Sequence, residues 1–371
     1  MSNSREITAV EAAAILINSV LGIGILNMPR FMVEAAGTGA PIVTIIGVLF
    51  VFISVWGITK LGMSFPTQSI VQYSERIIGK WLGRAYIFIA IIVFIFAAGL
   101  LLREFSEVLN TAVLFETPIE VSALVILFLA AYFTRDSLNT FAYIHLFYAP
   151  FIFIPGIIIA ALSIPKYNYL YLQPLFRVEV NEWFTGITSM APMFQGVFVL
   201  TIIIPFMKQP GLVMKASFWG TALAGGVYVI TVISALAIAG PEELKTMMWP
   251  ALEHARSVEV PGNFLERLGI VFLITWVIAV FTTIFSYYMI IVNVLRQLFR
   301  TQDHRMFSFF LFPLIFGVAM IPENVVQLYK GEMAKIVNWM GVMFLMGFPL
   351  LLVIVMKLRG LPLKGSGKKS D

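Results

Sequence analysis

Long apolar segments recur along most of the chain, and they constrain its fold more than any other feature of the sequence. Hydrophobic residues make up 60% of the 371 residues, whereas charged residues make up only 12%. Soluble domains carry roughly 25% charged residues, so this chain lacks the polar surface that a soluble protein needs. One membrane-spanning helix uses about 20 apolar residues. The sequence therefore predicts an all-α integral membrane protein whose loops are too short for a soluble catalytic domain.

We expect ten transmembrane helices in a single transmembrane domain. Their approximate bounds are 8–36, 40–63, 83–110, 118–134, 138–164, 183–207, 212–240, 262–299, 303–321 and 333–357. Lysine and arginine gather on the side of the N-terminus, which predicts that the tails, 1–7 and 358–371, are both cytoplasmic. Stretch 69–80 is apolar at helical spacing and predicts a short amphipathic helix on the membrane surface.

The residue inventory excludes several classes of protein. The chain has no cysteine and only three separated histidines, which excludes thiol chemistry and argues against a metal site. It has neither a phosphate-binding loop nor a complete dinucleotide fingerprint, so we expect no cofactor and no enzyme. The net charge of +5 reflects basic cytoplasmic loops and not nucleic-acid binding. The N-terminus shows no signal-peptide pattern, so we expect no cleaved leader.

The first and sixth spans contain residues that interrupt helices. The first holds 18–24 (NSVLGIG) and Pro29, and the sixth holds 190–196 (MAPMFQG) and Pro205. Glycine forms helices poorly and proline lacks an amide donor, although both are tolerated in membrane helices. The matching positions of the two interruptions predict an inverted repeat of five plus five helices, with repeats at about 8–164 and 183–357.

Unwound turns at mid-membrane free backbone groups that must find partners. A zwitterion supplies them, because its carboxylate suits the amides of a half-helix and its ammonium suits exposed carbonyl groups. We therefore predict a site for a small polar ligand, expected to be an amino acid, near the bilayer midplane. The candidate lining residues are Gly22, Ile23, Gly24, Phe96, Phe194, Gln195 and Gly196.

Four ionisable residues within the expected spans are candidates for proton transfer or gating. Glu11 either takes a proton or pairs with a basic residue, or lies at the inner interface as an early-turn acid. Arg103 and Glu107, four residues apart, form either an intrahelical pair or a gating or subunit contact. His145 either relays protons or is a hydrogen-bonded packing residue.

Hydroxyl groups follow one another along the eighth span, at Thr282, Thr283, Ser286 and Tyr287. A sodium ion could bind such oxygens together with carbonyl groups of the first interruption. Hydrogen bonds between helices are the commoner use of membrane hydroxyls, and no acidic residue accompanies these four. We therefore favour hydrogen bonding over a sodium site.

Several stretches of the sequence resemble a known family. Gly22-Ile23-Gly24-Ile25-Leu26 with Pro29-Arg30 resembles the broken first helix of the amino acid–polyamine–organocation (APC) superfamily. Further stretches resemble the B subunit of spore germinant receptors (the GerAB family). They are Leu102-Arg103 with Glu107, Glu116-Thr117-Pro118, Trp249-Pro250, Phe264-Leu265-Glu266-Arg267 and Trp276. The order and spacing of these stretches extend the resemblance from about Ile7 to Arg359.

The resemblance implies a leucine-transporter type of fold and a sensing role. Proteins of this family act in the inner membrane of bacterial endospores with an A subunit and a lipoprotein C subunit. A nutrient germinant, often an amino acid, binds and leads to ion release and germination. The implied pocket falls near Gly22, Ile23, Gly24, Gln195 and Gly196. The superfamily's ion-coupling residues do not map clearly onto this sequence, which favours a receptor over active transport.

Two other functions stay open at this point. A proton-coupled amino acid permease would need a titrating group, for which Glu11 and His145 are the attractive candidates. A structural subunit would anchor its partners and bind no ligand. Binding of a ligand without flux would favour the receptor, and concentrative uptake would favour the permease. Absence of both would favour the structural subunit.

Overall fold

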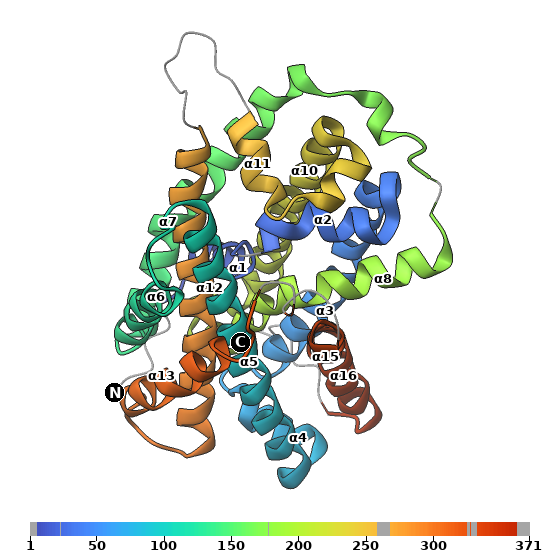
Figure 1. Ribbon diagram of the computed structural model, residues 1–371. Helices are drawn as coiled ribbons and strands as arrows, with labels where there is room; N and C mark the ends of the chain where they lie inside the picture. Colours follow the sequence, from blue (N-terminus) through green and yellow to red (C-terminus); the bar gives the residue numbers. More distant parts are fainter. Residues whose placement is uncertain are drawn as a thin grey trace.

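The computed structural model describes residues 6–22, 24–176, 178–257, 268–324, 327 and 332–361. These residues form helices joined by short loops, with one isolated backbone bridge between Ile7 and Met207 and no strand (Figure 1). The α-helices are α1 (Ala9–Val20), α2 (Gly24–Ala36), α3 (Ala40–Ser64), α4 (Ile70–Ile78), α5 (Lys80–Ala112), α6 (Ile119–Phe133), α7 (Leu138–Ser163), α8 (Val180–Met190), α9 (Leu200–Ile203), α10 (Val213–Thr246), α11 (Pro250–Ser257), α12 (Leu268–Leu298), α13 (Arg305–Ala319), α15 (Glu332–Val342) and α16 (Phe348–Leu358). Short 3-10 segments are η1 (Gly37–Gly39), η2 (Ile164–Lys166), η3 (Tyr169–Leu172), η4 (Ala191–Val199), η5 (Ile204–Phe206) and η6 (Pro210–Leu212), and η7 (Met343–Gly347) is a π-helix.

In the described part of the chain, every span that the sequence predicts coincides with a helical stretch, which confirms the all-helical prediction. The start of the predicted eighth span, 262–267, lies outside the described residues. Within the described part of the chain, seven helical stretches are long and apolar enough to cross a bilayer: Gly24–Ser64, Lys80–Ala112, Leu138–Lys166, Val180–Phe206, Pro210–Thr246, Leu268–Leu298 and Lys335–Leu358. Three apolar helices are shorter: Ala9–Val20, Ile119–Phe133 and Arg305–Ala319. Helix α10 extends beyond the predicted end at 240, with a kink at Gly240, whose φ is 76°.

Helix α12 forms the centre of the molecule. All of its residues from Ala279 to Leu295 are buried. A helix that is apolar and buried all round lies inside a bundle, because no face of it needs water or lipid. Helices α1, α5 and α7 pack directly against it, and the contact with α5 is the most extensive of the three. The hydroxyl groups predicted on the eighth span therefore point at other helices.

Helix α4 confirms the amphipathic helix expected between the second and third spans. Ser69 caps its first turn through a capping box with Gln72, and Gly79, at φ 93°, ends it. Ile70, Tyr73 and Ile77 are buried. They face the protein because α4 packs on α5 and α16.

The start of the first span and the end of the sixth are joined through their backbones. The amides of Glu6 and Ile7 both donate to the carbonyl of Phe206, at 2.9 and 3.1 Å, and the amide of Lys208 donates to the carbonyl of Ile7 at 2.9 Å. Phe206 is the last residue of the sixth helical stretch, so its carbonyl has no partner within the helix and is free to accept these bonds. The two interrupted spans are thus tied together at one end.

Candidate functional site

The first interruption is a real gap between helices. Helix α1 ends at Val20 and α2 begins at Gly24, with Leu21 and Gly22 in non-helical conformation between them. Ile23, a predicted site residue, lies outside the described residues. A helix end buried in a membrane must satisfy its last carbonyl groups and its first amides. The partners of those groups therefore decide what the gap can bind.

Side chains of other helices take up the carbonyl groups at the end of α1. The hydroxyl of Thr283, on α12, donates to the carbonyl of Asn18 at 2.8 Å. The hydroxyl of Tyr228, on α10, donates to the carbonyl of Val20 at 2.7 Å. This differs from the expectation that a ligand ammonium would meet these carbonyl groups, because the protein itself supplies the donors.

Glycine is required on both sides of the gap for reasons of space. A Cβ added at Gly22 would lie 2.4 Å from Oγ1 of Thr283, so this residue lets α1 approach α12. A Cβ added at Gly24 would lie 2.4 Å from the Tyr228 hydroxyl oxygen and 3.1 Å from Cβ of Met193. Real Cβ atoms do not approach other atoms so closely, and larger residues here would push the helices apart.

The second interruption has a different form from the first. The sequence predicts an unwound turn at 190–196, but α8 passes at Met190 directly into the 3-10 helix η4. Pro192 has no amide to donate, and the tighter winding keeps most other backbone groups bonded within the segment. The span therefore changes its winding here without opening.

Residues of η4 pack closely against the first interruption. A Cβ added at Gly196 would lie 2.0 Å from the backbone oxygen of Ser19, so the two interrupted spans touch through their backbones. Phe194 is fully buried, and its ring lies 5.2 Å from that of Tyr228. The structure therefore brings the two predicted stretches together.

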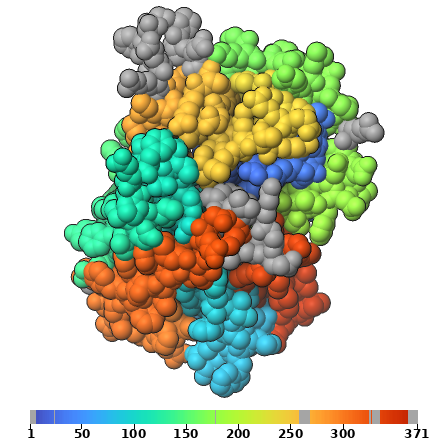
Figure 2. Space-filling model, in the orientation of Figure 1, coloured from blue at the N-terminus to red at the C-terminus, as the bar shows by residue number. Residues whose placement is uncertain are grey.

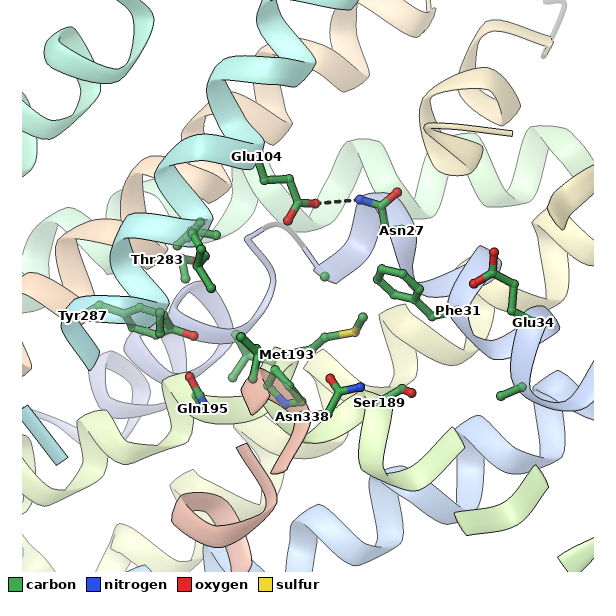
Figure 3. A pocket seen from close by; sticks show the side chains of 18 of the residues that line it. Asn27, Phe31, Glu34, Glu104, Ser189, Met193, Gln195, Thr283, Tyr287 and Asn338 are labelled. Atoms are coloured by element: carbon green, nitrogen blue, oxygen red, sulfur yellow. Dashed lines mark hydrogen bonds between the residues drawn. The ribbon is translucent and has the colours of Figure 1, made fainter. Parts of the chain in front are cut away.

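A cavity of about 290 Å³ lies beside the start of α2, between α2, α5, α8, η4, α12 and α15 (Figure 3). Its lining residues are Val20, Gly24, Asn27, Phe31, Glu34, Ala35, Ala97, Leu100, Leu101, Glu104, Thr185, Ser189, Pro192, Met193, Gln195, Thr283, Tyr287, Val337 and Asn338. The lining combines apolar residues with polar side chains from several elements, and such a combination is typical of sites for small molecules. Figure 2 shows α2, in blue, reaching the surface between the yellow residues of α10 and the green residues of α8.

The predicted lining residues are divided between the cavity and its supports. Gly24 and Gln195 line it, whereas Gly22, Phe194 and Gly196 pack behind its wall. Phe96 is 41% exposed and lies outside the cavity. Tyr287 and Thr283 line it, although the sequence suggested them only for a sodium site.

The sequence analysis missed a polar pair in the cavity wall. Glu104, on α5, and Asn27, on α2, are both buried, and Nδ2 of Asn27 donates to Oε1 of Glu104 at 2.6 Å. A signal was available, since an acidic residue in the middle of a 33-residue apolar helix is costly and needs a reason. Attention to the neighbouring Arg103–Glu107 spacing left Glu104 unconsidered.

Three of the four ionisable candidates, Glu11, Arg103 and Glu107, make structural contacts. Oε2 of Glu11 accepts from the amide and hydroxyl of Thr8, at 2.7 and 2.8 Å, and so closes the capping box at the start of α1. Arg103 forms a buried ion pair with Glu107 at 2.7 Å and also donates to the carbonyl of Glu323 at 2.9 Å. This pair joins α5 to the segment that follows α13.

His145 belongs to a hydrogen-bonded chain behind the first interruption. Its Nδ1 donates to the carbonyl of Phe141 at 2.9 Å, and its Nε2 lies 2.9 Å from Oγ of Ser286. Ser19 donates to Ser286 at 2.7 Å, and Asn18 donates to the carbonyl of His145 at 2.7 Å. The imidazole of His145 thus joins α7 to α12, and its backbone carbonyl joins α7 to α1.

The described residues contain no group of three or more His, Asp or Glu side chains that could hold a metal ion. The hydroxyl groups of Thr282 and Thr283 donate to the carbonyl of Asn18 on α1, at 3.4 and 2.8 Å, and so bond one helix to another. Thr282 also donates to Ala279, and Ser286 donates to Thr282, both within α12.

Comparison of the sequence with those of known proteins finds matches to spore germination proteins. A family model described as "Spore germination protein" matches residues 6–328. Spore germination protein YndE of Bacillus subtilis (strain 168) is 27% identical over 362 residues, which cover 96% of this chain and 98% of that protein. Spore germination protein A2 of the same strain is 24% identical over 359 residues, covering 95% and 97%. Spore germination protein GerLB of Bacillus cereus is 24% identical over 366 residues, covering 96% and 95%.

Proposed function

This chain belongs to the spore germination protein family, and on that premise we propose that it is the nutrient-sensing membrane subunit of a germinant receptor. In this proposal it binds a small molecule, an amino acid in the first instance, and signals to A and C subunits to trigger germination. It acts in the inner membrane of the spore, with both termini cytoplasmic. The observation that carries the proposal is the cavity of about 290 Å³ beside the gap in the first span.

The start of α2 gives this cavity a place for a carboxylate. The first amides of a helix have no partner within it and point back from its N-terminus, where the helix dipole also favours a negative charge. Gly24 is the first residue of α2 and lines the cavity. Leu100, Leu101 and Met193 supply apolar surface nearby for a ligand side chain.

Signalling follows from the number of elements that share the cavity. A ligand that touches α2, α5, η4 and α12 together favours whichever arrangement of these helices fits it best. Such a ligand shifts the population between two arrangements by the difference in its affinity for them. Partner subunits that contact these helices would sense that shift.

Ligand-induced thermal stabilisation tests the proposal. Purified protein in detergent is screened against the common amino acids, and a compound that binds the folded state raises Tm. Gly24→Leu should abolish the response, because its side chain would meet Tyr228 and Met193. Gly226→Leu is the matched control, since a Cβ there meets open space. Response of neither the wild type nor the control to any amino acid would refute the proposal.

The alternative of a proton-coupled permease is favoured by one observation, the buried His145 in its hydrogen-bonded chain. Protein in liposomes separates the two functions. Saturable binding without flux supports the receptor, whereas concentrative uptake of a labelled amino acid, driven by a pH gradient and lost in His145→Gln, supports the permease.

For the fold we propose ten spans in two inverted repeats. Helices α6 and α13 have 15 residues each, or about 22 Å at 1.5 Å per residue, and need locally thin bilayer to cross. The chain has no cysteine, so single cysteines introduced at Asp136, at Gln302 and in both tails report sidedness without background. All of these positions should react only with a label added from the cytoplasmic side, and reaction from the other side would contradict the ten-span arrangement.

A further inference from the structure

The polar groups of the cavity are arranged on two sides. Figure 3 shows Glu104 and Asn27 on one side and Gln195, Asn338 and Ser189 on the other. Oε1 of Glu104 accepts from Nδ2 of Asn27 at 2.6 Å, and this bond orients the carboxyl group. Glu104 is 6% exposed, so any group that binds it does so largely out of water.

Asn27 also fixes where this carboxylate lies relative to the start of α2. It follows Gly24 by three residues, which is close to one helical turn of about 5.4 Å. The amides at the start of α2 and the Glu104 carboxylate therefore border the same part of the cavity. A molecule with a negative group on the amides would place a group a few bonds away beside Glu104.

The last carbonyl groups of α1 already have donors within the protein. Those of Asn18 and Val20 accept hydrogen bonds from the hydroxyls of Thr283 and Tyr228. Among the described lining residues, carboxylates occur at Glu34 and Glu104, and Glu34 is exposed whereas Glu104 is buried. Glu104 is the acid nearer the gap.

We propose that Glu104, oriented by Asn27, binds the protonated amino group of the ligand and so makes the cavity selective for amino acids over sugars and simple carboxylic acids. This inference rests on the proposed function. A carboxylate is an acceptor only, and a charge-assisted bond to an ammonium is about twice as strong as a neutral one. A ligand with a hydroxyl in place of the ammonium keeps the shape but loses that bond.

The experiment compares matched ligand pairs on matched variants. Affinities of purified full-length protein are measured by calorimetry for each neutral L-amino acid that raises Tm and for its 2-hydroxy acid. The wild type should prefer the amino acid by about 10- to 100-fold, the range for one charged hydrogen bond. Glu104→Gln keeps the size and the contact with Asn27, and it should reduce that ratio to near one. Glu120→Gln, at an exposed acid in the first turn of α6, should leave the ratio unchanged.

The ratio separates recognition from mere support of the fold. A structural role for Glu104 would weaken the binding of both ligands equally, so an unchanged ratio in Glu104→Gln overturns the inference while leaving the proposed function in place. Glu104→Asp keeps the charge and serves where the Gln variant folds poorly; it should retain a preference for the amino acid. Absence of binding of any amino acid to the wild type overturns both the proposed function and this inference.

Discussion

The two interrupted spans satisfy the hydrogen bonds of their backbones in different ways. In the first, α1 ends at Val20, Leu21 and Gly22 are not helical, and α2 begins at Gly24, while in the sixth the α-helix passes into η4 with no gap. The difference follows from the neighbours. Thr283 and Tyr228 supply hydroxyl donors to the first span's carbonyl groups, so that span can open. A span opens in lipid only where other helices satisfy the backbone it releases.

The contact between the two spans gives the largest expected effect. Gly196→Ala would place a Cβ 2.0 Å from the oxygen of Ser19, and the clashing atom belongs to the backbone and cannot rotate away. We expect a loss of about 3 kcal/mol or more, at the upper end for overpacking, seen as low yield and a lowered Tm. Gly226→Ala is the control, and an equal Tm in the two variants would show that the spans can separate at no cost.

Removing one donor from the first gap should have the next largest effect. Tyr228→Phe leaves the buried carbonyl of Val20 without its hydrogen bond, which costs about 1–3 kcal/mol. Tm of the purified variant measures the loss. A Tm equal to that of the wild type would mean that the open form of the first span does not depend on this donor.

Acid should weaken the first span's surroundings more than those of the sixth. Helix α11 packs on α2 and is anchored by His254, whose Nε2 lies 2.6 Å from Oγ of Ser163. Burial lowers the pKa of His254 from 6.5 to about 4. The unfolded form therefore binds a proton more readily between these values, and stability is full above pH 6.5 and falls as the pH drops towards 4.

The acid effect should reach about 2 kcal/mol at pH 5, as an upper figure for a pKa difference of this size. It is measured as the Tm difference between pH 7.5 and pH 5. His254→Gln should remove that part of the pH dependence, because glutamine does not titrate. If both proteins lose the same Tm on acidification, another group is responsible.

The smallest effect is expected in the sixth span. Pro192→Ala restores an amide donor to a segment whose backbone is already largely bonded, so we expect a change within about 1 kcal/mol in either direction. A large loss of Tm would show that the proline, and not the neighbouring helices, sets the winding of η4. The difference between the two spans would then come from sequence alone.

The sequence predicted those features that depend on local pattern. Apolar length located the helices, apolar residues at helical spacing over 69–80 located α4, and Gly22 and Gly24 marked the first gap. The form of the second interruption was not predictable, because it depends on which side chains from distant helices face the backbone. Phe96 was assigned to the pocket by its type, but only packing decides which face of α5 is inward.

The cavity wall shows the same limit. Glu104 and Asn27 are 77 positions apart, and their 2.6 Å contact is a product of how α2 and α5 cross. An acid beside the Arg103–Glu107 pair in an apolar helix could have been noticed without the structure. Its partner, its orientation and its place beside Gly24 could not.

The backbone bonds between Ile7 and the segment from Phe206 to Lys208 set a direction for movement. In the proposed orientation these bonds join the cytoplasmic ends of the two interrupted spans, so we expect the spans to rotate relative to each other about that end. Any widening between them grows with distance from the hinge and is greatest at the opposite side of the bilayer. A ligand that arrives from the outer side of the membrane would therefore meet the ends of the spans that can separate, and not the ends that are joined.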